Sequence, residues 1–213
     1  MENKNTTLGV VAVLAIAASL TYLYFTQFAG PPKVNLTPFE NLGYVVAEET
    51  AKLLNNQGRV LVVSEVFEAM KSPNTEAQVK GFKAGLAKSG GVQLKEAKEF
   101  KRSMSDDPQN WPPGQAAVFV NMGDNANALV LFVGLPLNLS RDDIAAMKES
   151  KSKLIVVGGQ SPLLKTLLKD GVIHMAIVNR FPPAPAPSGS EKPREWFNRV
   201  YMVVTPATVD QLP

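Results

Sequence analysis

Four short segments carry the side chains best suited to bind a ligand or to do chemistry. Each follows an apolar run that predicts a β-strand. In an open parallel sheet, ligands bind beyond the carboxyl ends of the strands, so these positions are the first candidates for a site. The segments are Ser64 with Glu65, Gly134 to Pro136, Gly158 to Ser161, and Asn179 with Arg180.

The most specific of these segments is Gly158-Gly159-Gln160-Ser161. Flexible backbone before a helix can turn free amides toward an anion. A tight turn in which Ser161 caps the helix gives the same sequence, because serine is a preferred N-cap residue. Both interpretations are open at this point.

Candidate catalytic residues lack partners in the sequence. Glu65 could bind a ligand hydroxyl or act as a base, but no second carboxylate lies at a spacing that would pair with it. Asp142 and Asp143 follow Ser140 in the first turn of a predicted helix, where negative charge complements the helix dipole. His174 lies in an apolar run with no serine beside it, which favours a packed structural histidine. We therefore predict no catalytic residue and no enzyme.

The composition excludes several classes of site. The 213 residues include no cysteine and one histidine, which argues against disulfides, thiol nucleophiles and metal sites built from thiolates or histidines. The formal net charge is +3, and the Lys and Arg residues are spread among acidic ones, unlike the basic stripe of a nucleic-acid binder. We expect no metal, no cofactor and no nucleic-acid partner.

The hydrophobic pattern predicts an α/β fold. Strands that are apolar throughout and separated by helices are typical of a parallel sheet covered on both faces. We expect one doubly wound, mostly parallel sheet of about five to six strands. The predicted strands are residues 59–64, 92–100, 128–133, 153–157, 172–178 and, at a sheet edge, 201–205. The predicted helices are residues 43–57, 74–88, 114–123, 140–149 and 161–169.

Two excursions, residues 101–113 and 181–193, interrupt this pattern, and their prolines favour extended, exposed backbone. Trp111 belongs to the first excursion, while Trp196 and Phe197 accompany the second. Exposed aromatic side chains there would contact a partner. Lids packed on their own domain would have the same sequence.

An apolar segment near the N-terminus predicts a membrane anchor. Residues 8–28 contain no charge and would form a helix of roughly 30 Å, enough to cross a bilayer. Aromatic side chains crowd its C-terminal end, where a membrane interface favours them: Tyr22, Tyr24, Phe25 and Phe28. A cleaved signal peptide and a buried core helix are the competing interpretations, and the segment's length favours the uncleaved anchor. The predicted organisation is a tail over 1–7, a transmembrane helix over 8–28, a linker over 29–40 and a domain over 41–213.

Residues 79–96 and 167–178 resemble the type 1 periplasmic sugar-binding proteins and the related LacI-type regulators. The resemblance covers roughly residues 59–180 and implies the C-terminal type of lobe in that family. In its first motif, Gly81, Phe82 and Leu86 match a helix that follows a strand. The second motif is a glycine before an apolar strand, matched by Gly171, Ile173 and Ala176.

The resemblance fails where the family binds its sugar. Members usually carry an Arg before the Gly-Phe pair, an Asn-Asp after the middle strand and a Gly-x-Asp after the next one. This chain has Gln78, Gly134-Leu135 and Gly158-Gly159-Gln160 in those places. Glycine and leucine cannot make the bidentate hydrogen bonds on which a sugar site depends. The length after the anchor is also that of one lobe, whereas the family encloses its ligand between two.

Two functions follow from these expectations. The first is a non-catalytic accessory or scaffolding subunit of a larger membrane complex, possible roles being respiratory, photosynthetic or transport-related. Its partners would be the bilayer and other subunits of that complex. The second is a membrane-tethered receptor for a small polar ligand such as a sugar. Both place the protein in a bacterial-type inner membrane, with the N-terminus in the cytoplasm and the domain in the periplasm.

Overall fold

The computed structural model describes residues 2–28, 34–68, 72–158 and 161–212. The chain divides into two compact units, residues 1–35 and residues 36–213. Each unit is described by itself below.

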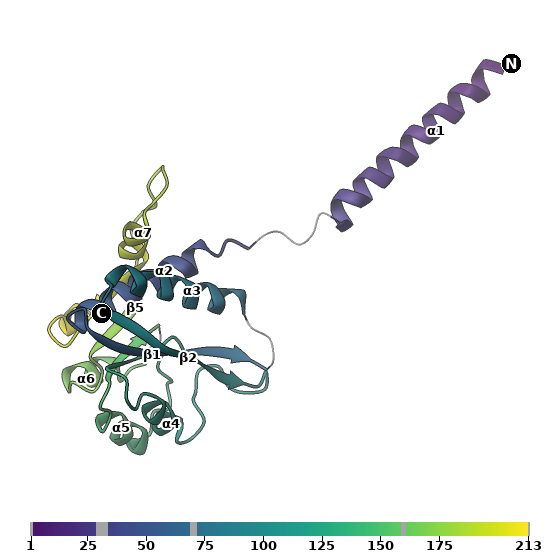
Figure 1. Ribbon diagram of the computed structural model, residues 1–213. Helices are drawn as coiled ribbons and strands as arrows, with labels where there is room; N and C mark the ends of the chain where they lie inside the picture. The colour runs from purple at the N-terminus through teal and green to yellow at the C-terminus, as the bar shows by residue number, and fades with distance from the viewer. Residues whose placement is uncertain (1, 29–33, 69–71, 159–160, 213) are drawn as a thin grey trace. The chain divides into compact units, whose positions relative to one another are not determined.

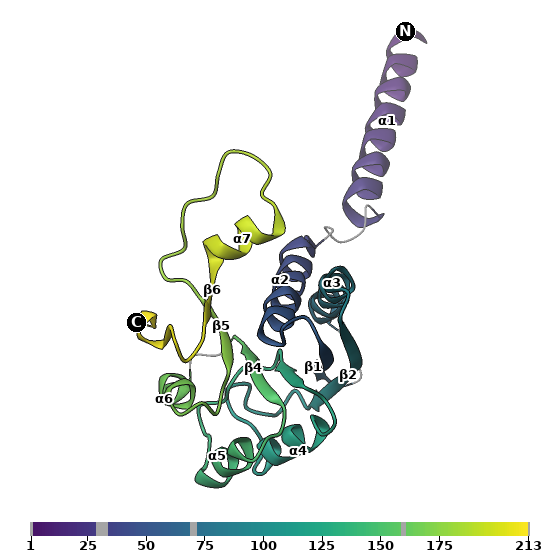
Figure 2. The same cartoon turned by 60° about the vertical axis from the view of Figure 1, so that its left-hand side comes forward.

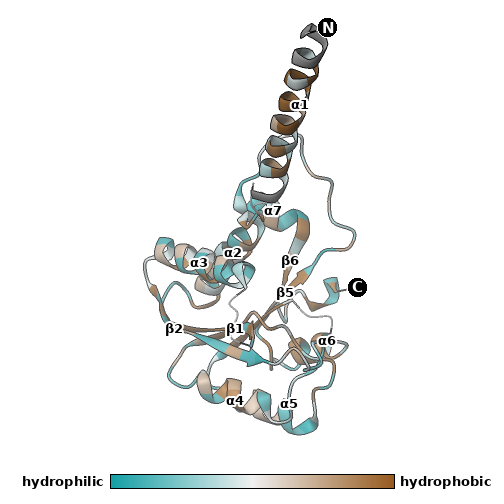
Figure 3. Cartoon of the chain, turned by 90° about the vertical axis from the view of Figure 1, so that its right-hand side faces the viewer, coloured by the Kyte–Doolittle hydropathy of each residue, from teal (hydrophilic) through white to brown (hydrophobic). Residues whose placement is uncertain are grey.

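The first unit is a long apolar helix. Helix α1 (Glu2–Leu23) continues as a π-helix, η1 (Tyr24–Phe28). Within it, the 20 residues Thr7–Thr26 have a mean hydropathy of 2.1, which the brown colour of α1 in Figure 3 illustrates, and none of them is buried. The hydroxyls of Ser19 and Thr21 donate to carbonyls one turn earlier at 2.8 Å, which satisfies them without water. The helix is therefore long and apolar enough to cross a membrane. A signal sequence can have the same length and composition.

The second unit is built on one six-stranded sheet with the order β2-β1-β3-β4-β5-β6 (Figure 1). Strands β1 to β5 pair in parallel, and β6 is antiparallel to β5 at the edge. The strands are β1 (Gly58–Phe67), β2 (Val92–Arg102), β3 (Ala128–Leu131), β4 (Lys153–Val157), β5 (Met175–Asn179) and β6 (Tyr201–Val204). The predicted α/β class and mostly parallel sheet are confirmed.

Helices cover both faces of this sheet (Figure 2). One layer holds α2 (Thr37–Leu53), α3 (Pro73–Ser89) and α7 (Pro193–Val200), and the other holds α4 (Gln115–Met122), α5 (Arg141–Lys148) and α6 (Leu164–Lys169). A short 3-10 helix, η2 (Val209–Gln211), follows β6. Side chains alternate between the two layers along each strand, so Val60 and Val62 pack beneath α2 and α3 while Leu61 and Val63 face the other layer. Two cores therefore share one sheet.

Helices α2 and α3 pack against each other through glycines. A Cβ atom at Gly43 of α2 would lie 1.9 Å from the Gln78 carbonyl oxygen, and one at Gly81 of α3 would lie 2.0 Å from the Glu40 carbonyl oxygen. Both distances are far below van der Waals contact, so the two backbones approach only because these residues lack side chains. This contact draws α3 toward α2.

Several element bounds differ from the predictions. Strand β4 has the predicted bounds, but α2 begins at Thr37, within the stretch predicted as linker. Helix α7 was not predicted, because the prolines before it suggested extended backbone throughout. Its start is nevertheless a local signal: Pro193 is at the first helical turn, and Glu195 accepts a hydrogen bond from the Lys192 backbone at 3.0 Å.

Candidate functional site

The chain turns sharply where β3 and β4 end. Gly134 has a φ of 66° and Gly158 a φ of 81°, both in the left-handed region that glycine tolerates best. Each glycine closely follows the end of its strand. Open space lies beyond the carboxyl ends of these two neighbouring strands.

That space is a cleft of about 450 Å³, here called the strand-tip cleft. It is lined by Pro108, Gln109, Trp111, Phe132, Val133, Gly134, Leu135, Pro136, Leu137, Val157 and Gly158. Its size lies within the range of small-molecule sites. Its position outside the carboxyl ends of parallel strands is where open α/β sheets bind ligands.

One wall of the strand-tip cleft comes from the excursion over residues 101–113. Its Trp111 amide donates to Asn138 Oδ1 at 3.2 Å, and Asn138 Nδ2 donates back to the Trp111 carbonyl at 3.1 Å. The Leu137 amide donates to the Gln109 carbonyl at 2.9 Å. These bonds join the excursion to the loop after β3, so the two sides of the cleft are fixed to each other.

Arg102 holds the same wall from inside. Its side chain is 3% exposed and forms an ion pair with Glu65 at 2.9 Å. Its guanidinium also donates to the carbonyls of Asp107, of Pro108 at 3.3 Å and of Asn110 at 3.1 Å. A single buried cation thus satisfies three carbonyls of an irregular loop that has few backbone partners of its own.

Aromatic rings support the wall from the core. Trp111 is 6% exposed, and its ring meets Phe119 edge-on with centroids 5.0 Å apart. Phe119 in turn meets Phe100 of β2 edge-on at 5.1 Å. These edge-to-face contacts anchor the excursion in the core beneath α4.

The structure separates the residues predicted to bind a ligand. Gly158 lines the strand-tip cleft. Ser64 lines a different hollow under α3, and Glu65 pairs with Arg102 as part of the wall. Gly159 and Gln160 lie outside the described residues.

Three further predicted residues lie apart from the cleft. Ser161 is buried, and its hydroxyl accepts from the Leu163 amide at 3.4 Å. Because α6 begins at Leu164, the prediction that Ser161 caps this helix is wrong. Asn179 is exposed at the end of β5, and Arg180 donates through Nε to the Asn198 carbonyl at 3.1 Å, which ties it to α7.

The predicted partner contacts through aromatic residues need correction. Trp111 and Phe197 are buried in their own domain, with Phe197 at 0% exposure, because both complete hydrophobic clusters. Trp196 is partly buried and packs edge-on against Tyr201 with centroids 5.7 Å apart. The alternative, aromatic lids packed on their own domain, describes these residues. A different aromatic is free to meet a partner: Phe181 is 93% exposed.

The helix-cap and histidine predictions agree with the structure. Ser140 Oγ accepts from the Asp143 amide at 3.1 Å, and Asp143 accepts in return from the Ser140 amide at 3.1 Å, which completes a capping box on α5. His174 Nδ1 accepts from the Leu154 amide at 3.3 Å. Burial, aided by the positive charge of Lys153, lowers the pKa of His174, so the ring acts as a neutral structural acceptor.

The sequence analysis missed the residues that shape the cleft. Gln109 and Asn138 lie in irregular segments, and Asn138 meets Trp111 across 27 positions of sequence. Arg102 is the last residue of β2. No local sequence pattern singled out Arg102, and its role is visible only in the structure, where this charged residue ends β2 and is almost fully buried. A charge is rarely buried unless paired, so this burial marks the residue as an anchor.

The lining determines what the strand-tip cleft can do. Most of its side chains are apolar, and the exposed amide of Gln109 at the rim is its main polar side chain. Such a surface can bind the apolar face of a ligand and one hydrogen-bonding group, and it lacks a paired base and nucleophile. Within the described ranges, no group of three or more His, Asp or Glu side chains is placed to hold a metal ion.

Comparison with solved structures defines the fold. The sequence matches no protein-family model and no curated protein. The arabinose-binding protein AraP of Geobacillus stearothermophilus superposes with a TM-score of 0.54 at 18% identity, over 82% of this chain and 63% of that one. A sugar-binding protein of a Bacillus halodurans sugar ABC transporter gives a TM-score of 0.55 at 15% identity, over 82% and 64%. An ABC transporter periplasmic solute-binding protein of Actinobacillus succinogenes, solved with bound D-allose, gives 0.53 at 15% identity, over 81% and 60%.

These similarities show that the second unit has a periplasmic-binding-protein-like fold. At such identities they show the fold alone. The chain spans less than two thirds of the length of each of these proteins.

Proposed function

We propose that this protein is a non-catalytic receptor, tethered to a membrane by α1, whose strand-tip cleft binds a small polar ligand such as a sugar. The observation that carries the proposal is the cleft itself: about 450 Å³ of space at the carboxyl ends of β3 and β4. Its apolar lining suits the carbon-bearing face of a sugar ring, and Gln109 can bind a hydroxyl.

Three features support this proposal. The structural neighbours are named as binding proteins for arabinose and other sugars, and one contains D-allose. Arg102 and Asn138 fix the wall of the cleft before any ligand arrives, which lowers the entropic cost of binding. Where family members read hydroxyls with an Asn-Asp pair, this chain has Gly134-Leu135, so a second chain that supplies polar groups opposite the cleft would complete the site.

A ligand screen tests the receptor. The full chain in detergent micelles is melted with and without arabinose, allose, fructose, glucose and other monosaccharides. Ligand at about 100 times its dissociation constant should stabilise the folded domain by about 2.7 kcal/mol. For a domain of this size, that is a rise in Tm of about 5 to 10 °C.

Variants locate the binding. Gln109→Ala should weaken a sugar about threefold to tenfold, because one neutral hydrogen bond is lost. Gln93→Ala removes an equally exposed amide from β2, away from the cleft, and should change nothing. A sugar that stabilises wild type and Gln109→Ala equally would contradict this placement, and no response to any sugar would contradict the receptor.

A second candidate function is the accessory subunit of a membrane complex. It is favoured by the arm between β5 and α7, which projects from the domain in Figure 2. Residues 181–190 of this arm are exposed throughout, and Phe181 is 93% exposed. A proline-rich, preformed extended segment with an exposed aromatic ring loses little entropy when a partner binds it.

Co-purification from the native membrane tests this second candidate. Subunits that accompany the wild-type chain should be lost with Phe181→Ser, whose Tm should stay within about 1 °C because the side chain touches no core. If the chain purifies alone, or if Phe181→Ser keeps every subunit, the accessory role through this arm is wrong.

A further inference from the structure

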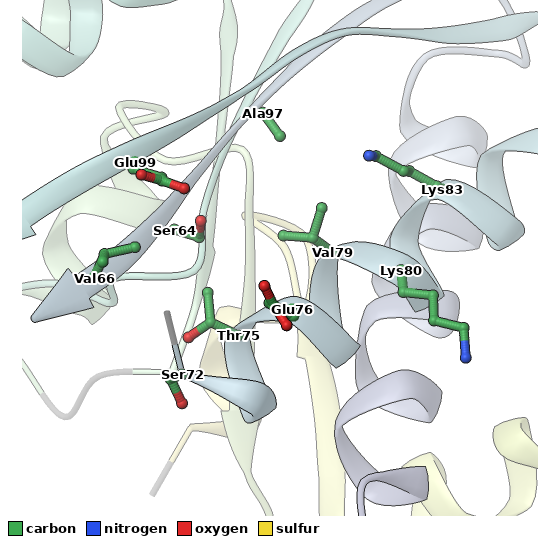
Figure 4. A pocket seen from close by; sticks show the side chains of 10 residues that line it. All are labelled: Ser64, Val66, Ser72, Thr75, Glu76, Val79, Lys80, Lys83, Ala97 and Glu99. Carbon is green, nitrogen blue, oxygen red and sulfur yellow. The ribbon is translucent and has the colours of Figure 1, made fainter. Parts of the chain in front are cut away.

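A second hollow, here called the α3 groove, lies on the face of the sheet that α2 and α3 cover, between α3 and the strands β1 and β2. Its volume is about 460 Å³, similar to that of the strand-tip cleft. Ser64 and Ala97 form part of its floor, and Glu76, Val79 and Lys83 of α3 form one side (Figure 4). It shares no lining residue with the strand-tip cleft.

The groove exists because the sheet carries small side chains at this place. Under α2 and α3 the sheet presents Val60 and Val62, both fully buried. Farther along the same face come the small residues Ser64 and Ala97, and Ala97 is exposed. The close glycine contact at Gly81 also fixes α3 against α2. The small residues on the sheet and the fixed position of α3 together shape the hollow.

Charges of opposite sign face each other across this groove. In Figure 4, Lys83 reaches in from α3 on one side, and the carboxylates of Glu76 and Glu99 lie toward the other. Lys80 points away and pairs with Glu40 of α2 at 2.7 Å. Neither Glu76 nor Lys83 has an ion pair with another residue that the structure describes. The groove thus keeps one positive and one negative group available at opposite ends.

The spacing of these groups sets the size of a matching ligand. Glu76 and Lys83 are seven residues apart on α3, about 10 Å along the helix axis. An extended chain of three residues spans about 10 Å, with an ammonium at one end and a carboxylate at the other. Val79 and Ala97 lie between the charges and can contact small apolar side chains, while the Ser64 hydroxyl on the floor can bond a peptide group.

We propose that the α3 groove binds a short zwitterionic peptide, with its ammonium group at Glu76 and its carboxylate at Lys83. This site is separate from the strand-tip cleft in place and in ligand chemistry. A single amino acid has its charges too close together to reach both ends, and a sugar has neither charge.

Calorimetric titration of the full chain in detergent micelles tests the site, with trialanine as the probe. Trialanine should bind, and both N-acetyl-trialanine and trialanine amide should bind at least about fivefold more weakly, because each lacks one terminal charge. Lys83→Met and Glu76→Gln should each weaken trialanine by a similar factor. Raising the salt concentration should weaken binding further, because the groove is open to solvent.

Matched variants keep the result specific. Lys165→Met removes an exposed lysine from α6 on the other layer and should leave trialanine binding unchanged. Gln109→Ala should also leave trialanine binding unchanged. A negative result in the sugar screen therefore does not decide whether trialanine binds, and a negative trialanine titration does not decide whether a sugar binds. The proposal is overturned if trialanine gives no binding up to about 10 mM. It is equally overturned if N-acetyl-trialanine and trialanine amide bind as tightly as trialanine, or if neither Lys83→Met nor Glu76→Gln weakens trialanine binding.

Discussion

The strand-tip cleft and the α3 groove have nearly equal volumes, about 450 and 460 Å³, yet they are built in different ways. Most side chains that line the cleft are apolar, and its wall is an irregular loop held by the buried Arg102. The groove is lined by charges on regular elements, one of which, α3, packs against α2 through glycines. One sheet thus supports two hollows whose shapes depend on different residues, so each can be altered without the other.

The largest expected effect comes from removing the cation in the wall of the cleft. Arg102→Met leaves three loop carbonyls without their donor and Glu65 without its partner, and we expect a loss of about 3 kcal/mol in the free energy of unfolding. Sugar binding should weaken, while trialanine binding should not change. Urea unfolding of the full chain measures the first effect, with the exposed Arg141→Met of α5 as control. Equal stability of the two variants would mean that Arg102 does not hold the wall.

The next largest expected effect is a loss of stability in a variant that alters the α3 groove. Gly43→Ala places a methyl group within 1.9 Å of the Gln78 carbonyl, so α2 and α3 must separate, at a cost of about 2 kcal/mol. Trialanine binding should change, while sugar binding stays the same. Gly189→Ala is the control, because a Cβ at that position meets open space. A Gly43→Ala protein as stable as wild type would contradict the close helix contact.

A smaller effect is expected at the junction of α7 and α2, which borders neither hollow. Arg194 donates to Glu49 at 2.5 Å and to Glu48 at 2.6 Å, and its side chain is 33% exposed. Since solvent screens such a pair, Arg194→Gln should cost about 1 kcal/mol or less. Binding of sugar and of trialanine should both persist. Loss of either ligand in this variant would show that the hollows are coupled through α2.

The smallest effect is the pH dependence contributed by His174. Burial lowers its pKa in the folded state, so the unfolded chain binds this proton more readily. The free energy of unfolding should therefore fall as the pH drops through the ordinary histidine pKa of about 6.5. Well above that pH, His174 is neutral in both states and causes no loss of stability. His174→Asn should lose less stability than wild type between pH 7.5 and pH 5.5 in urea unfolding. The same loss in both proteins would contradict a neutral, partly buried ring.

Local sequence patterns predicted most of the fold. Continuous apolar runs indicated strands such as β4, whose bounds match, and Ser140 with Asp143 indicated the start of α5. These features depend on residues close together in the chain. Helix α7 was missed because its prolines suggested extended backbone, although Glu195 provided a cap signal.

The candidate site was less predictable, because its contacts join distant segments. Gly134 and Gly158 could be located from strand ends alone, since only the order of elements was needed. Arg102 pairs with Glu65 across 37 positions, and no local pattern indicates that pairing. The side of the sheet that Ser64 faces depends on strand register, which decided whether it lines the cleft or the groove.

The assignment of a ligand to the strand-tip cleft is tested most directly by one calorimetric comparison. Wild type, Gln109→Ala and Lys83→Met are titrated, as full chains in detergent, with the monosaccharide that gives the largest thermal shift. We predict that Gln109→Ala weakens this sugar about threefold to tenfold and that Lys83→Met leaves its affinity unchanged. Weakening by Lys83→Met instead, or no heat of binding from any of the three proteins, would contradict a sugar site at the ends of β3 and β4.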